Sequence, residues 1–164
     1  IGSTPQHNGW TGNWIQFLRQ HRFGYQLELA RQNGISGPLL DLGARLLPVL
    51  DDFFPGYRPL PSLLHGDLWA GNAGFARNGE PVVFDPAVYY GDREADLAMT
   101  ELFGGFGAEF YAAYRETWPL EPGYPARRTL YNFYHILNHA NLFGGGYIRQ
   151  AENMARSLLA VAGR

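Results

Sequence analysis

Lysine and cysteine are both absent from this sequence of 164 residues. All thirteen basic residues are arginines, so the chain alone has no lysine to form a Schiff base, to complete a Walker motif or to clamp nucleotide phosphates. The absence of cysteine excludes disulfides, thiolate nucleophiles and cysteine metal sites. Several chemistries are therefore excluded from the chain acting by itself.

Charge and hydropathy exclude further classes of protein. With 15 acidic and 13 basic residues the net charge is -2, and such a balance predicts no nucleic-acid partner. No apolar run is long enough to cross a membrane and no signal peptide is present at the start, so we expect a cytoplasmic protein without membrane contact. A content of 46% hydrophobic and 15% aromatic residues can bury a sizeable core in one domain or one lobe.

Hydrophobic periodicity predicts a mostly helical chain with one small β element in its middle. Residues 1–12 are rich in Gly, Pro, Asn and Thr and are expected to form an extended opening segment. A helix should begin near Trp14, with Asn13 or Thr11 as its N-cap. Further helices are expected over residues 25–32, 38–54 (kinked or split at Pro48), 92–103, 108–117, 125–143 and 147–162.

The β element is expected between residues 60 and 90. Leu63 and Leu64 form a short apolar stretch that ends at His65. Residues 73–76 and 81–84 should be two strands, because the Asn-Gly pair at 78–79 between them is a strong hairpin signal.

Three oxygen-bearing side chains accompany this β element. Asp67 and Asn72 flank a tight loop after the first apolar stretch, and Asp85 follows the second strand of the hairpin. Asn72 and Asp85 are hard oxygen ligands that suit Mg²⁺, which commonly also binds nucleotide phosphates. Asp67 is then left to accept a proton from an attacking hydroxyl. Together these groups predict phosphoryl transfer.

The spacing of these residues distinguishes a catalytic site from aspartates that only form turns. Aspartates beside Gly and Asn are usually turn formers and caps, so an isolated His-x-Asp motif is weak. Here Asn72 follows Asp67 by five residues and Asp85 follows it by eighteen. That order and spacing match the catalytic loop and the metal-binding loop of kinases.

The sequence resembles the fructosamine kinase (ketosamine-3-kinase) family over essentially its whole length. The matching stretches are 65–72 (HGDLWAGN), 83–99 (VFDPAVYYGDREADLAM), 103–106 (FGGF), 134–141 (YHILNHAN) and the opening 1–6 (IGSTPQ). The resemblance implies that residues 1–164 are the C-terminal, helical lobe of a protein-kinase-like fold, mainly α with a small β-hairpin. The N-terminal lobe, with the clamping lysine, is expected to be missing, and residues 1–12 are expected to enter from it.

The resemblance also implies a function. It implies an ATP- and Mg²⁺-dependent kinase that phosphorylates a sugar hydroxyl of ketosamines, the adducts of sugars with free or protein amines, in deglycation. Asp67 is then the catalytic base, and Asn72 and Asp85 hold Mg²⁺. The metal loop reads Asp-Pro-Ala where protein kinases have Asp-Phe-Gly, which argues against a protein-kinase substrate. Without its partner lobe, the isolated chain is expected to be inactive.

Two alternatives remain open at this point. The chain could belong to an aminoglycoside- or choline-kinase-like phosphotransferase, since those enzymes also depart from the protein-kinase form of the metal loop. It could instead be a non-catalytic lobe fragment, because the N-terminal lobe is missing.

Two further residues are expected to support the site structurally. His65 should pack under the loop and hold its backbone. Asp96, at the start of a helix, either stabilises the helix dipole or bonds the backbone of the catalytic loop, and the two roles are compatible.

Candidate substrate-binding residues are aromatic or lie on one helix face. Trp69 either packs in the core or stacks on a sugar or amine-bearing substrate. His135, Asn138 and His139, with Asn141, line the sugar pocket or serve helix packing; a zinc site is disfavoured because no third ligand is evident. The run 92–94 (Asp-Arg-Glu) is expected to form an exposed helix start or to meet a cationic substrate. Further candidate pocket aromatics are Tyr89, Tyr90 and Tyr147.

Overall fold

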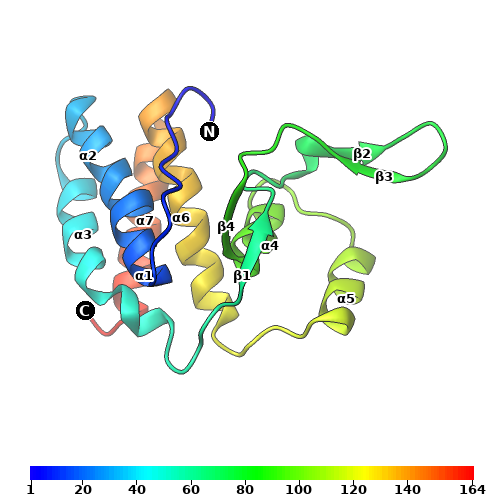
Figure 1. The fold of residues 1–164 in the computed structure, drawn as a ribbon. Coiled ribbons are helices and arrows are strands. Elements are labelled where there is room, and N and C mark those ends of the chain that lie inside the picture. Colours follow the sequence, from blue (N-terminus) through cyan, green and yellow to red (C-terminus); the bar gives the residue numbers. More distant parts are fainter.

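The computed structural model describes residues 1–164 and contains helices and two small β-sheets (Figure 1). No helix in it has an apolar stretch long enough to pass through a membrane. The elements follow in the order α1 (Trp14–Phe17), a π-helix (Leu18–Gly24), α2 (Tyr25–Gln32), α3 (Pro38–Leu46), a 3-10 helix (Leu47–Phe53), β1 (Pro61–Leu64), a 3-10 turn (Ala70–Asn72), β2 (Ala73–Phe75), β3 (Pro81–Val83), β4 (Tyr89–Asp92), α4 (Arg93–Leu102), α5 (Ala108–Thr117), α6 (Tyr124–Phe143) and α7 (Gly146–Val161).

Helix α6 lies at the centre of the molecule. It packs against α7, α4 and α2, and α7 in turn packs on α3. Residues 130–138 of α6 are all buried, as expected for a helix surrounded by other elements. The helical body therefore lies on one side of α6, while α4 and the sheet β1–β4 lie on the other (Figure 1).

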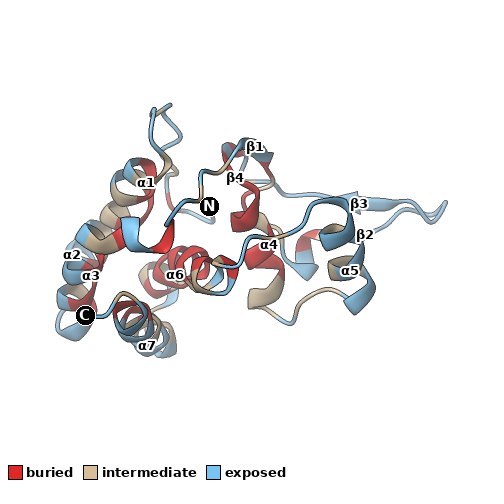
Figure 2. Cartoon of the chain, turned by 90° about the horizontal axis from the view of Figure 1, so that it is seen from below, coloured by how far each residue is buried: buried red, intermediate tan, exposed pale blue.

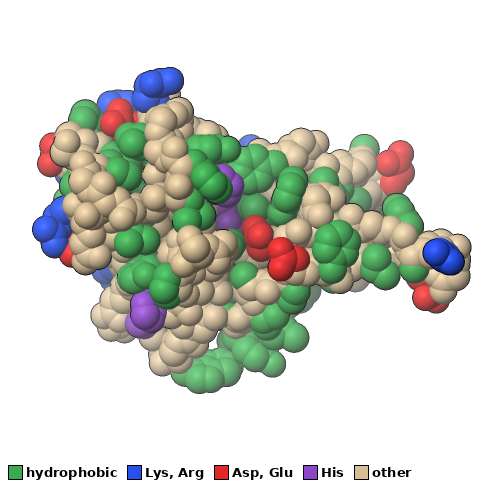
Figure 3. Space-filling model, turned by 90° about the horizontal axis from the view of Figure 1, so that it is seen from above, with side chains coloured by type: hydrophobic (Ala, Val, Ile, Leu, Met, Phe, Trp, Pro, Cys, Tyr) green, Lys and Arg blue, Asp and Glu red, His purple; other side chains and the backbone are tan.

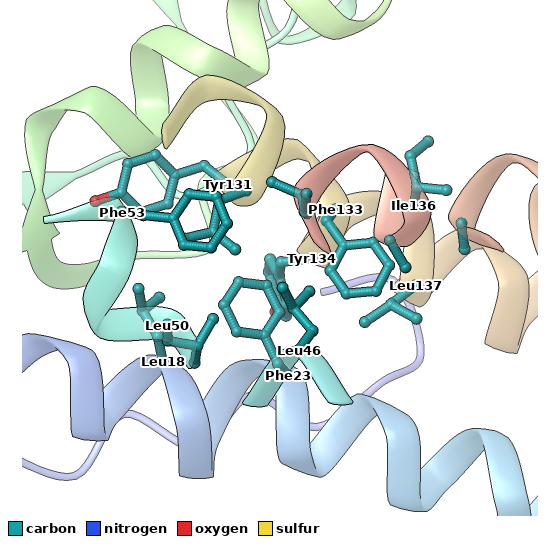
Figure 4. Close-up of a cluster of buried hydrophobic side chains, with 14 of the residues drawn as sticks. Leu18, Phe23, Leu46, Leu50, Phe53, Tyr131, Phe133, Tyr134, Ile136 and Leu137 are labelled. Carbon is teal, nitrogen blue, oxygen red and sulfur yellow. The ribbon is translucent and has the colours of Figure 1, made fainter. Parts of the chain in front are cut away.

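The core between these helices is built from aromatic and leucine side chains (Figure 4). Phe23 and Phe133 stack with ring centroids 5.7 Å apart, and Leu46 belongs to the same cluster. All three are at most 1% exposed. Because each fully buried side chain of this size contributes about 1.5–3 kcal/mol, this cluster holds the π-helix, α3 and α6 together.

The β structure forms two sheets, where the sequence predicted one element. The predicted hairpin is confirmed: β2 and β3 pair antiparallel, with Ala73 opposite Val83. The second sheet was not predicted and pairs β1 with β4, with Leu64 opposite Tyr89. The hairpin extends away from the body and is largely exposed, whereas α4 and α6 are buried (Figure 2).

Most helix boundaries are confirmed, and the differences have local causes. The helices after residue 92 begin and end within one residue of the expected positions. Asn13 is the N-cap of α1, and its side chain accepts the amide of Gln16 at 2.9 Å. The helix expected over 38–54 changes to 3-10 geometry at Leu47, next to Pro48, which has no amide hydrogen to donate. The π-helix was not predicted.

The expectation that Asp92, Arg93 and Glu94 are exposed or meet substrate is wrong. Their exposed fractions are 1%, 9% and 0%. Glu94 forms an ion pair with Arg127 at 2.6 Å, and Asp92 accepts a hydroxyl hydrogen bond from Tyr131. Glu94 therefore joins α4 to α6 and Asp92 joins β4 to α6, while Arg93 donates to the main-chain oxygens of Trp118 and Pro119 after α5.

Candidate active site

The loop after β1 is fixed from two sides. Leu64, the last residue of β1, is 3% exposed and belongs to the core. The next two amides, of His65 and Gly66, donate to the two carboxylate oxygens of Asp96 at 2.7 and 2.8 Å. Asp96 lies in the first turn of α4. The structure thus places Asp96 against the backbone of the loop that carries Asp67.

The imidazole of His65 links this loop to the segment after the hairpin. Its Nδ1 accepts the amide of Asp67 at 3.3 Å, and its Nε2 lies 2.9 Å from the carbonyl oxygen of Phe84. Because Nδ1 is an acceptor, the ring hydrogen lies on Nε2 and is donated to Phe84. The main-chain oxygen of His65 accepts the amide of Ala87 at 2.8 Å. His65 therefore holds the backbones of both loops.

Gly66 permits the close approach of the two loops. Its φ is +82°, in the left-handed region, and a Cβ at this position would collide with the carbonyl of Ala87. Any larger residue would separate the loop carrying Asp67 from the segment carrying Asp85.

Asp67 and Asn72 face each other across the tight loop. The Nδ2 of Asn72 donates to the main-chain oxygen of Asp67 at 3.0 Å and to its Oδ2 at 3.3 Å. Asn72 is 6% exposed, so its amide group is held in one orientation. With the nitrogen engaged in this way, Oδ1 is the side-chain oxygen that remains for a ligand.

Asp85 follows β3 in an uncommon backbone conformation. Its φ of 55° is the one positive value among the non-glycine residues. Such conformations are sparse outside glycine, are enriched in Asn and Asp, and cluster at functional sites. The amide of Phe84 donates to the main-chain oxygen of Asn72 at 3.0 Å, which fixes the segment immediately before Asp85.

The charges around Asp67 show which groups share its surroundings. Burial raises the pKa of Asp67, the charge of Asp85 acts in the same direction, and His65 and His139 oppose it. Asp85 and His139 therefore lie near enough to Asp67 to influence it. On the upper face of the molecule, acidic and histidine side chains gather beside hydrophobic ones (Figure 3). A carboxylate with a raised pKa is a better proton acceptor at neutral pH.

A series of rings extends from the Asp67 loop to the last two helices. Trp69 meets Phe103 edge to face, with centroids 6.3 Å apart; Phe103 lies 5.1 Å from His139, and His139 lies 5.0 Å from Tyr147. We call these four residues the aromatic group. Trp69 is 38% exposed, so the group has an open side. Ring faces of this kind bind apolar surfaces and cations.

The structure does not bring all predicted substrate residues to this place. His135 is 4% exposed, and burial, assisted by the charge of His139, lowers its pKa to about 3. Asn138 is 2% exposed and accepts a hydrogen bond from Gln26 at 3.1 Å. Asn141 donates to the main-chain oxygen of Gln26 at 2.9 Å. These three side chains therefore serve helix packing, the alternative that the sequence left open.

The tyrosines also separate into different environments. Tyr147 belongs to the aromatic group, whereas Tyr89 is 8% exposed and belongs to the core. Tyr90 stacks on Trp10 at 5.2 Å and borders a cavity of about 450 Å³ that Asp67 does not line. Phe103 is the candidate to which the sequence assigned no role; its signals were its place in the family-matching stretch 103–106 and just before the Gly-Gly pair that follows α4.

Comparison with known proteins gives one consistent result. A model of the fructosamine kinase family matches residues 1–161. The chain is 53% identical over 161 residues to a probable ketoamine kinase of Synechocystis, covering 98% of this chain and 54% of that protein. It is 52% identical over 147 residues to a chloroplastic protein-ribulosamine 3-kinase of Oryza sativa, covering 90% and 43%.

A solved structure agrees. A crystal structure from Thermobifida fusca described as a "putative fructosamine-3-kinase" superposes with a TM-score of 0.88 at 36% identity, covering 98% of this chain and 56% of that one. The chain therefore spans about half the length of the relatives that it matches.

Proposed function

This chain belongs to the fructosamine kinase family, and from that premise we propose that it is the catalytic lobe of an ATP- and Mg²⁺-dependent kinase acting on a sugar hydroxyl of ketosamines. The observation that carries the proposal is the arrangement of Asp67, Asn72 and Asp85 on two loops joined by His65. The names of the relatives as ketoamine and ribulosamine kinases support the class of substrate.

Asp67 is the proposed base. In phosphoryl transfer the protein mainly positions the reactants and offsets charge, so the base has to orient the attacking hydroxyl and accept its proton. The raised pKa of Asp67 suits this task, because a carboxylate of very low pKa is a poor acceptor. The amide of Asn72 holds one carboxylate oxygen and fixes its orientation.

Asn72 and Asp85 are the proposed Mg²⁺ ligands. Mg²⁺ prefers oxygen ligands, and it usually takes only one or two from the protein and the rest from phosphate and water. The free Oδ1 of Asn72 and the exposed carboxylate of Asp85 fit that donor set. When bound, the ion would neutralise the charge of the nucleotide phosphates.

The aromatic group is the proposed acceptor side of the site. It begins at Trp69, two residues after Asp67, and is completed by Phe103, which follows α4, and by side chains of α6 and α7. The ring of Trp69 can stack on the sugar, and the charge of His139 acts on the carboxylate of Asp67. His135 and Asn138 have no part in this proposal, because both are buried and engaged elsewhere.

Residues 1–164 are proposed to be a C-terminal lobe, with residues 1–12 entering from a missing N-terminal lobe. The chain spans about half of its relatives and has no lysine to clamp phosphates. The β2–β3 hairpin exposes apolar side chains that a second lobe and a nucleotide base could cover: Phe75 at 80%, Val83 at 62% and Phe84 at 49%.

The proposal is tested with a chimera. The N-terminal half of the Synechocystis relative, joined to Ile1, would supply the proposed second lobe; this chain is 53% identical to the part of that relative that it matches. We expect the chimera to consume ATP with ribulosamines and fructosamines, the Asp67→Ala chimera to be inactive, and residues 1–164 alone to be inactive. Turnover of aminoglycosides or choline but not of ketosamines would replace the proposed substrate class. A chimera that binds ATP but phosphorylates nothing would favour a non-catalytic lobe.

A further inference from the structure

Arg22 is a buried cation with no carboxylate partner. Its side chain is 1% exposed, and its hydrogen bonds go to neutral groups: the main-chain oxygens of His7 (2.9 Å) and His21 (3.0 Å) and the side-chain oxygen of Asn8 (2.8 Å). Burial of an unpaired charge is costly, so a fold rarely retains one without a use.

Aromatic rings compensate part of this cost. The guanidinium carbon lies 4.5 Å from the ring centroid of Phe17, 4.3 Å from that of Tyr89 and 5.3 Å from that of Tyr134. Attraction between a cation and ring faces is strongest where water is excluded, as it is here. The Nε of Arg22 has no partner, so the polar contacts of this side chain are concentrated on one end.

The backbone around Arg22 is adapted to this placement. Arg22 belongs to the π-helix Leu18–Gly24, a rare form that is frequent at functional sites. A Cβ at Gly24 would collide with the carbonyl of Arg19, so the wide turn depends on glycine at that position.

The segment that Arg22 contacts is held by side chains, among them Trp10 stacked on Tyr90. Residues 5–12 form no regular structure and make no main-chain to main-chain hydrogen bond. Asn8 uses both ends of its amide: Oδ1 accepts from Arg22, and Nδ2 donates to the main-chain oxygen of Val88 at 3.2 Å. Arg22 and Asn8 thus connect the π-helix to Val88, between Asp85 and β4.

We propose that Arg22 is a positioning residue that, through Asn8, fixes the segment 85–89 and so holds Asp85 in place. His65 holds this segment on one side, at Phe84 and Ala87, and Asn8 holds it at Val88. The inference rests on the proposed role of Asp85 as a magnesium ligand. It adds a requirement outside the loops of Asp67 and Asp85. Residues 5–12 must be bound to Arg22 and Val88 for the segment that carries Asp85 to be held in place.

The most informative variant is Asn8→Asp. It keeps an oxygen for Arg22 and gives the buried cation a carboxylate partner, but it removes the donor to Val88 and places a negative charge against that carbonyl. We expect its global stability to be unchanged or higher, while amides of residues 84–92 exchange with solvent about fivefold faster, the change expected for one lost hydrogen bond. If Asn8 served global stability alone, the exchange protection of residues 84–92 would rise or fall together with the global stability.

The exchange experiment uses residues 1–164 and hydrogen exchange read by mass spectrometry, so it needs no activity. Asn33→Asp is the matched control: Asn33 is exposed and bonds Asn141 at the far end of α2, so exchange of 84–92 should not change. Unchanged or slower exchange in Asn8→Asp would overturn the proposal.

A second readout uses the active chimera. There, Asn8→Asp should raise the Mg²⁺ concentration for half-maximal rate about fivefold, with kcat at saturating Mg²⁺ much less affected. An active chimera in which Asn8→Asp leaves the Mg²⁺ concentration for half-maximal rate unchanged would also overturn the proposal. A chimera without ketosamine kinase activity but with faster exchange in Asn8→Asp would instead reject the proposed function and leave the docking of the opening segment standing.

Discussion

The carboxylate of Asp96 and the main-chain amide of His65 are joined by a hydrogen bond of 2.7 Å, and a second one reaches the amide of Gly66. Both bonds have an ionisable acceptor, which makes them stronger than neutral ones. They attach the loop that carries Asp67 to α4, and α4 packs on the central helix α6. The loop of Asp67 is therefore held by the helical core and not only by the strand that precedes it.

Asp96→Asn should weaken this connection. An asparagine offers one acceptor oxygen to two amides, so one amide loses its partner. We expect the free energy of unfolding to fall by about 1.5–3 kcal/mol, the contribution of a hydrogen bond to a charged group, as measured by urea denaturation. Glu116→Gln on the exposed face of α5 is the control and should change stability by less than about 0.5 kcal/mol. Equal stability of the two variants would show that the Asp96 contacts are dispensable.

Asp67→Asn should stabilise the fold of residues 1–164, and in the chimera it should abolish phosphoryl transfer. Burial raises the pKa of Asp67 above its value in the unfolded chain, so ionisation costs the folded state stability as pH rises through the folded-state pKa. The melting temperature of the variant should exceed that of the parent at pH 7.5. The difference should vanish below about pH 4, where the carboxyl of the unfolded chain is protonated as well. Exposed Asp52→Asn should show no such gain, and a lower melting temperature for Asp67→Asn at pH 7.5 would contradict the argument.

Gly71→Ala should displace the indole of Trp69 without unfolding the protein. A Cβ at Gly71 would collide with the far edge of that ring, which can swing away, while the backbone there is not left-handed. In the chimera we expect KM for the ketosamine to rise about tenfold with KM for ATP unchanged, because the proposed stacking on Trp69 is worth roughly 1–2 kcal/mol. Gly12→Ala, where a Cβ meets nothing, is the matched control. If the acceptor KM does not change, Trp69 does not contact the acceptor.

Arg127→Met should be strongly destabilising. The pair that it forms with Glu94 is 1% and 0% exposed, so removal of the arginine leaves a buried, unpaired carboxylate. We expect a loss of about 3–5 kcal/mol in the free energy of unfolding. The double variant Glu94→Leu, Arg127→Met should lose less than either single variant, because both charges leave the core together. Additive losses in this double-mutant cycle would mean that the two side chains do not compensate each other.

Local sequence signals were sufficient for much of the fold and for the acidic part of the site. The Asn-Gly pair at 78–79 fixed the hairpin, and apolar spacing located the later helices within one residue. The spacing of Asp67, Asn72 and Asp85 predicted that the three side chains lie close together, because only a tight loop and a short hairpin separate them along the chain. In the structure, hydrogen bonds of His65 and Asn72 join the loop of Asp67 to the segment immediately before Asp85.

The features that were missed depend on contacts between distant parts of the chain. Strand β4 exists because it pairs with β1, and its Tyr-Tyr-Gly-Asp run has no signal of its own. The buried state of Glu94 depends on Arg127, which no local pattern connects to it. The aromatic group likewise draws its members from two loops and two helices. His139 was predicted to bind substrate, whereas Phe103 lay in a family-matching stretch but no local pattern gave it a role.

The π-helix also bears on how this chain tolerates insertions and deletions. A π-helix holds more residues per turn than an α-helix, so Leu18–Gly24 can be regarded as an α-helix with one residue inserted. If the same seven residues were wound as a regular α-helix, the extra residue would rotate α1 about 100° relative to α2. Trp14 and Phe17 would then leave their stacking contacts with Tyr89. In this stretch, chain length constrains the protein as strictly as residue identity does.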